Sequence, residues 1–158
     1  MAASAPSIYW EDFQIGHVAE FGDKLVTEEE IIRFAREFDP QPFHLDSEAA
    51  KKSLFGGLCA SGWHTCAMTM RMVCDEYLLR SASLGSPGLE NLRWIKPVRP
   101  GDRLRVRFVV LDARPSSSRP TVGLIRTRWE VMNQNNEEVM QIESNAMFAR
   151  RPPTPEKA

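Results

Sequence analysis

One long apolar helical pattern, between Ser61 and Leu79, most constrains what this chain can fold into. Apolar side chains recur there at intervals of three and four residues, the spacing that keeps them on one face of an α-helix of about four turns. They are Trp63, Cys66, Ala67, Met70, Val73, Cys74, Tyr77 and Leu78. A helix that buries so broad a face requires an apolar surface of similar extent to pack against.

Four extended segments after this helix can supply that surface. They span residues 89–98, 102–111, 121–133 and 138–150, and are separated by the turn-like stretches PVRPGD, PSSSRP and NQNN. Such short links favour antiparallel pairing. Arg103, Arg105 and Arg107 alternate with Leu104, Val106 and Phe108, so one face of the sheet is polar and the other apolar. We therefore predict an α+β fold, in which a curved antiparallel sheet wraps around one long central helix.

The first third of the sequence predicts a strand and two helices. A strand is expected over residues 17–26. Thr27 and Glu30 form a capping box before a helix whose apolar stripe consists of Ile31, Ile32, Phe34, Ala35 and Phe38. Asp46 can cap a short helix over residues 47–52.

Composition limits the number of domains, the classes of partner and the location of the protein. With 158 residues, 42% of them hydrophobic and 26% charged, we expect a single domain over 1–158, with a core of about residues 10–150 and frayed ends at 1–7 and 152–158. A net charge of −1 argues against nucleic acid as a partner. No segment is apolar enough to cross a membrane and the start does not resemble a signal peptide, so we expect a cytoplasmic protein. Cys59, Cys66 and Cys74 have no metal-binding spacing and are expected to be buried free thiols, with no metal and no cofactor.

The stretch FDPQPFH, residues 38–44, contains two candidate functional side chains. Because proline cannot continue a helix, we predict a stiff loop that fixes the directions of Asp39 and His44. Such a pair can share one water, as addition of water to a double bond requires. Gly62, at the start of the long helix, can offer its N–H to a carbonyl oxygen. Each residue also has an ordinary alternative: Asp39 as a loop residue, His44 as a structural histidine, Gly62 as a helix start. His17 and His64 are interpreted as structural or surface residues.

Four stretches together resemble the MaoC-like acyl dehydratases, relatives of the R-specific enoyl-CoA hydratases. They are EDFQIG, FDPQPFHLD, FGGLCASGWHT and LRWIKPVRPGD. The resemblance implies the hotdog fold and covers residues from about 10 to 150. It makes Asp39 and His44 the catalytic pair for a 2-enoyl thioester, and Gly62 the residue that polarises the thioester carbonyl.

The resemblance has three departures near the site. Gln41 stands where the family has asparagine, Phe38 where a glycine is frequent, and Ser61 where a histidine often precedes the glycine. Gln41, Phe43, Ser61 and Trp63 are the expected substrate-binding residues. Phe38, Phe43 and Trp63 suggest an apolar acyl pocket.

The expected function is therefore that of a lyase, a reversible enoyl-CoA hydratase or 3-hydroxyacyl-CoA dehydratase. The expected partner is an acyl-CoA thioester, and the resemblance implies a homodimer or a larger homo-oligomer. Two alternatives stay open at this point. The first is a hotdog acyl-CoA thioesterase, and the second is a non-catalytic subunit that binds acyl thioesters.

Overall fold

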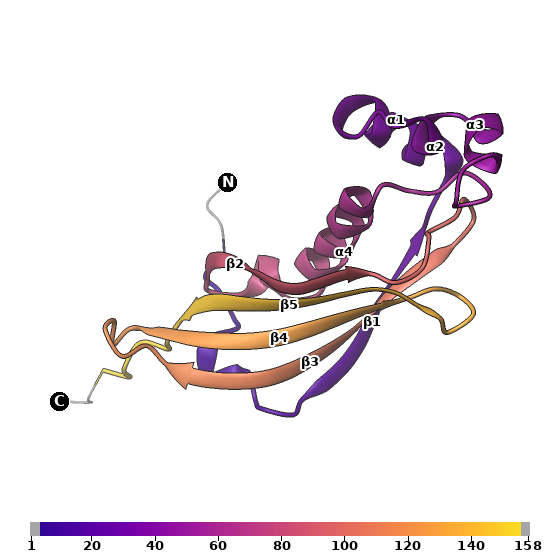
Figure 1. Cartoon of the computed structure of the whole chain (residues 1–158). Coiled ribbons are helices and arrows are strands. Elements are labelled where there is room, and N and C mark those ends of the chain that lie inside the picture. Colours follow the sequence, from indigo (N-terminus) through magenta and orange to yellow (C-terminus); the bar gives the residue numbers. More distant parts are fainter. Residues whose placement is uncertain (1–3, 156–158) are drawn as a thin grey trace.

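In the computed structural model, which describes residues 4–155, a five-stranded sheet curves around one long helix (Figure 1). All strand pairs are antiparallel, and the order across the sheet is β1-β3-β4-β5-β2. The strands are β1 (Val18–Leu25), β2 (Ser83–Trp94), β3 (Arg103–Pro115), β4 (Val122–Met132) and β5 (Glu138–Ala149). The long helix, α4 (Gly62–Glu76), lies over one face of this sheet. The predicted α+β arrangement is confirmed.

The buried face of α4 differs from the predicted one. Trp63 and Met70 are 58% and 44% exposed, so they do not belong to the core. The buried residues of α4 are His64, Thr65, Met68, Thr69, Met72 and Val73. The two threonines can be buried because their hydroxyls donate to backbone carbonyls one turn earlier, as Thr69 Oγ1 does to Thr65 O at 2.8 Å. A pattern of apolar residues alone therefore misplaces this face.

Three helices between β1 and α4 form a lobe at the N-terminal end of α4: α1 (Glu28–Phe38), α2 (Pro42–Leu45) and α3 (Ser47–Lys51) (Figure 1). Thr27 accepts from the Glu30 N–H at 3.2 Å, which confirms the predicted cap of α1. The Glu30 carboxylate pairs with Lys24 at 2.9 Å, so the second half of the expected capping box is replaced by an ion pair to β1. Asp46 caps α3 as predicted, accepting from the Ala49 N–H at 2.7 Å.

Two predicted features of the later sequence have different outcomes. The alternation in β3 is confirmed: Leu104, Val106 and Phe108 are buried, while the arginines between them pair with acids on the outer face.

Strand β2 begins at Ser83, six residues earlier than expected, although Gly85, Pro87 and Gly88 suggest turns. As an edge strand with shifts in register, β2 tolerates these residues.

Other predictions for the chain concern membranes, cysteines and the ends. Within residues 4–155, no helix is both long and apolar enough to cross a membrane. Cys59 is buried, whereas Cys66 and Cys74 are only partly buried, and all three are free thiols. Residues 1–3 and 156–158, part of the ends expected to fray, lie outside the described residues.

Close packing of β4 against the N-terminal 3-10 helix η1 (Trp10–Asp12) gives a stability prediction. A Cβ at Gly123 would lie 2.0 Å from Cγ of Trp10, whose indole N–H donates to Leu124 O at 3.2 Å. We expect Gly123→Ala to lower the free energy of unfolding by about 1–3 kcal/mol, measured by urea denaturation, because the methyl group overpacks the contact. In a Trp10→Ala background the same change should cost little. Equal losses in both backgrounds would contradict the steric explanation.

Candidate active site

Asp39 and His44 come together where the lobe meets the start of α4. Asp39 directly follows α1, and its backbone, at φ −149° and ψ 70°, is no longer helical. The predicted stiff loop is only half right, because Pro42 begins the short helix α2 and His44 is its third residue. Proline is well suited to the first position of a helix, where its missing N–H has no role. The turn places His44 Nε2 3.4 Å from Asp39 Oδ2.

Two hydrogen bonds hold the Asp39 carboxylate. The Ser61 hydroxyl donates to Oδ2 at 2.6 Å, and the Gln41 side-chain amide donates to Oδ1 at 2.7 Å. Burial on its own raises the pKa of Asp39, but these hydrogen bonds and the nearby His44 outweigh it, so the pKa is lowered. Asp39 is therefore an ionised acceptor at neutral pH.

His44 is held as firmly from its other side. The ring is buried, with 5% of the residue exposed, and Nδ1 lies 2.7 Å from the Cys59 carbonyl oxygen. Because a carbonyl oxygen can only accept, Nδ1 carries the proton in the neutral ring and Nε2 has a free lone pair. Nε2 and Asp39 Oδ2 are then two adjacent acceptors. One water that donates a hydrogen bond to each would have its own lone pairs directed away from these two acceptors.

Gly62 is the first residue of α4, and its N–H has no hydrogen-bond partner among the described residues. The Ser61 hydroxyl, which donates to Asp39, also accepts from the Trp63 N–H at 3.3 Å. The start of α4 is thus connected to Asp39 through the hydrogen bonds of Ser61. From the other side, Trp94 Nε1–H donates to Gly62 O at 3.0 Å, and its indole lies where a Gly62 side chain would be.

These groups line a pocket of about 430 Å³. Of the residues predicted from the sequence, the pocket wall includes Asp39, Gln41, Phe43, His44, Gly62 and Trp63. Ser61 is 1% exposed and does not line the pocket. Its hydroxyl instead donates a hydrogen bond to Asp39. The expectation that Phe38 lies near the acyl pocket is wrong, because its side chain lines a different cavity.

The wall residues that sequence reasoning missed include two aromatic ones. Trp94 and Phe55 both line the pocket, and Phe55 packs on Phe43 with ring centroids 5.0 Å apart. Trp94 lies within the quoted stretch LRWIKPVRPGD, but its role depends on a contact with Gly62, 32 residues earlier in the chain. No local pattern signals such a contact.

A cysteine next to a histidine could suggest nucleophilic catalysis, but the geometry here argues against it. Cys59 Sγ is 3.8 Å from His44 Nδ1, the nitrogen whose proton goes to the Cys59 carbonyl. Burial raises the pKa of the Cys59 thiol, although the charge of Arg99 opposes this. The thiol is therefore protonated at neutral pH. Within residues 4–155, no group of three or more His, Cys, Asp or Glu side chains is arranged to hold a metal ion.

Comparisons with known proteins agree with this architecture. Residues 12–139 match the family model described as the MaoC like domain. The chain is 32% identical to YdeM of Bacillus subtilis, over 89% of this chain and 98% of that protein. Its structure is similar to the crystal structure of a MaoC-like dehydratase from Rhodospirillum rubrum, with a TM-score of 0.87 and 43% identity, over 93% of this chain and 100% of the other.

A more distant structural neighbour identifies the fold. It is a protein from Mycobacterium tuberculosis with a double hotdog fold, and its TM-score is 0.79 at 19% identity. The similarity covers 98% of this chain and 47% of the neighbour. The sheet and helix described here thus form a hotdog fold.

Proposed function

The chain belongs to the MaoC-like domain family of hydratases and dehydratases, and from this premise we propose that it reversibly adds water to 2-enoyl thioesters, forming 3-hydroxyacyl thioesters. The observation that carries the proposal is the Asp39–His44 pair, 3.4 Å apart, in the same pocket as Gly62, whose N–H has no hydrogen-bond partner among the described residues. Two adjacent acceptors and one donor are what hydration of a conjugated carbonyl requires.

In the proposed mechanism, one water donates its hydrogen bonds to His44 Nε2 and Asp39 Oδ2. Its oxygen attacks the β-carbon, and the π electrons move towards the thioester oxygen, which the Gly62 N–H stabilises as an enolate. The water proton passes to His44 Nε2, and the same pair returns a proton to the α-carbon. Dehydration follows the reverse path, so one pair serves as both base and acid.

Coenzyme A is the proposed acyl carrier, and an apolar acyl group is the proposed occupant of the pocket. Phe43, Phe55, Trp63 and Trp94 contribute four large aromatic side chains to its wall. Ring faces and edges of this kind contact alkyl chains without requiring a polar partner.

The direct test is the ultraviolet absorbance of 2-enoyl-CoA thioesters of short, branched and medium chain length, mixed with the purified protein. Loss of the conjugated enoyl signal, with a 3-hydroxyacyl-CoA as product, would support hydration. Release of free thiol without that product would favour the thioesterase alternative. Binding without turnover across the panel would favour a non-catalytic subunit, and either result would overturn the proposed reaction.

Ser61 provides a prediction on pH dependence. Its hydrogen bond lowers the pKa of Asp39, so Ser61→Ala should raise that pKa and shift the acidic limb of the kcat/KM profile to higher pH. Ser81→Ala is a suitable control, since the Ser81 hydroxyl donates to Tyr77 O, at the end of α4 that is farther from the pair. An acidic limb at the same pH in Ser61→Ala and the native protein would show that this hydrogen bond does not tune Asp39.

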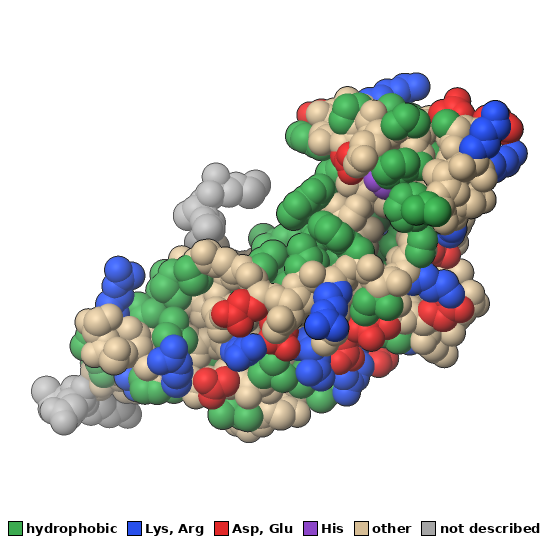
Figure 2. Space-filling model, in the orientation of Figure 1, with side chains coloured by type: hydrophobic (Ala, Val, Ile, Leu, Met, Phe, Trp, Pro, Cys, Tyr) green, Lys and Arg blue, Asp and Glu red, His purple; other side chains and the backbone are tan. Residues whose placement is uncertain are grey.

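We further propose that the protein is a homodimer or larger homo-oligomer joined through β2. Among residues 4–155, strand β2 pairs only with β5, so its other edge is open there, and it carries the exposed Leu84 and Leu89. Figure 2 shows hydrophobic side chains gathered over α4 and β2, beneath the lobe. Light scattering after gel filtration should give at least twice the mass of one chain, and a monomeric mass would contradict this proposal.

A further inference from the structure

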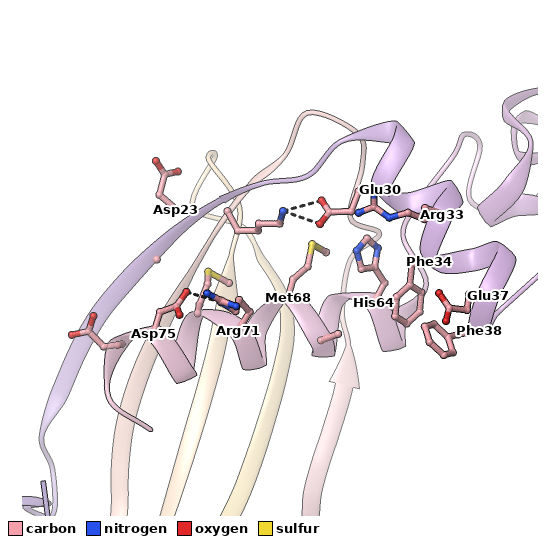
Figure 3. Close-up of a pocket in the computed structure, with 15 residues that line it drawn as sticks. Asp23, Glu30, Arg33, Phe34, Glu37, Phe38, His64, Met68, Arg71 and Asp75 are labelled. Carbon is pink, nitrogen blue, oxygen red and sulfur yellow. Dashed lines mark hydrogen bonds and ion pairs between the residues drawn. The ribbon is translucent and has the colours of Figure 1, made fainter. Parts of the chain in front are cut away.

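Figure 3 shows a second cavity, of about 610 Å³. The α4 residues that line it are different from those that line the Asp39–His44 pocket. It is bounded by β1, α1 and α4, and neither Asp39 nor His44 lines it. Its size is within the range of small-molecule sites. The reaction proposed above assigns no role to this cavity.

Much of the cavity wall is apolar and adaptable. Phe34 and Phe38 line it from α1, and Ala67, Met68 and Met72 line it from α4. Met68 and Met72 are buried, and methionine side chains adjust to ligands of irregular shape. An alkyl chain is the simplest group that fits such a wall.

His64 supplies a polar group at one end. It is 4% exposed, stacks on Phe34 with ring centroids 4.7 Å apart, and its Nδ1 is sealed from solvent with no hydrogen-bond partner among the described residues. Burial lowers the pKa of His64, so the ring is neutral at pH 7. A sealed acceptor without a partner is better tolerated than a sealed N–H, which assigns the proton to Nε2. The ring therefore offers a donor.

The charges around His64 favour an anionic group. Lys24 and Glu30 pair with each other at 2.9 Å, and Arg33, one turn along α1, forms no salt bridge among the described residues. These three are the charged residues that act on His64. Figure 3 shows Arg33 beside His64, with Glu37 farther along next to Phe38. At the far end, Asp75 is neutralised by Arg71 at 2.9 Å, and Glu76 forms no salt bridge among the described residues. Asp23, which also lines the cavity, pairs with Arg103 at 2.8 Å. The His64 end thus carries one cation in excess.

We propose that this cavity binds a free alkyl carboxylate, with the carboxylate on Arg33 and His64 Nε2. The alkyl tail lies along Phe34, Met68 and Met72. Because Phe38 lines the cavity and Asp39 is the next residue, an occupant contacts the end of α1 that carries the acid. The inference does not depend on the proposed reaction, since it concerns binding by a separate set of residues.

Calorimetric titration with three probes of equal chain length tests the head group. Octanoate should bind more tightly than octanol, and octanol more tightly than octylammonium, because the His64 end offers a donor and a cation. Absence of octanoate binding, or equal binding of the three probes, would overturn the proposal.

Variants locate the site. Arg33→Gln and His64→Phe should each weaken octanoate binding by about tenfold, since each removes a donor to a charged group. Ala67→Trp should abolish binding by filling the cavity. Arg36→Gln, which removes an exposed cation of α1 outside the cavity, should leave the affinity unchanged. Circular dichroism checks that each variant is folded.

Two results of the variant series would overturn the proposal. If octanoate instead occupies the Asp39–His44 pocket, Arg33→Gln and Ala67→Trp will leave its affinity unchanged. If the attraction is only that of surface charge, Arg36→Gln will weaken binding as much as Arg33→Gln.

Discussion

Loss of either member of the Asp39–His44 pair is expected to lower kcat for hydration of a 2-enoyl-CoA by about 10²- to 10⁴-fold, the range that positioned acid–base groups contribute. In Asp39→Asn the amide can no longer accept as an anion, and its NH₂ group can face Nε2 in place of the water. In His44→Ala the proton acceptor is absent. KM should change much less than kcat, because the aromatic wall that holds the acyl group is retained.

Folding must be separated from chemistry in these variants, since His44 is buried and bonded to the Cys59 carbonyl. His44→Asn is the sharper variant, because its amide can still donate towards that carbonyl while the Nε2 position is lost. His17→Ala is the matched control, as His17 is exposed and does not line the pocket. Folded Asp39→Asn and His44→Asn proteins with near-native kcat would exclude this pair as the acid–base group.

The parts of the fold that sequence predicts well are those determined by neighbouring residues. Thr27 and Asp46 cap helices within three residues of themselves, and both caps were predictable from residue type and spacing. Asp39 and His44 are close because the turn between them is short and contains two prolines. For such features, local backbone chemistry is sufficient.

The features that the sequence did not predict depend on contacts between distant segments. The face of α4 that is buried is selected by the sheet, and Thr65 and Thr69 enter it because the helix backbone satisfies their hydroxyls. Phe38 continues the apolar stripe of α1, but it is 64% exposed and lines the second cavity. Trp94 contacts Gly62 because the pairing of β2 with β5 places the end of β2 beside the start of α4.

That contact between Trp94 and Gly62 makes the glycine a site of large expected effect. A Cβ at Gly62 would lie 2.3 Å from Cε2 of Trp94, which is closer than two non-bonded carbon atoms can approach. Gly62→Ala must therefore displace the indole, break its hydrogen bond to Gly62 O, and shift the N–H proposed to stabilise the enolate. We expect kcat/KM to fall by about 10²-fold, near the lower end of the loss seen when one such donor is removed.

Two further variants separate the steric effect from the electrostatic one. Gly57→Ala is the matched control, since its nearest contact, Arg99 Nη1, would be 3.4 Å away, and activity should be retained. In Gly62→Ala/Trp94→Ala the methyl group has room, so part of the activity should return if displacement of the indole is the cause. If the double variant is as inactive as Gly62→Ala, the methyl group itself blocks the approach of the thioester oxygen to the helix start. Native activity in Gly62→Ala would instead mean that the start of α4 does not bind the reacting carbonyl, because a side chain there cannot coexist with the present position of Trp94.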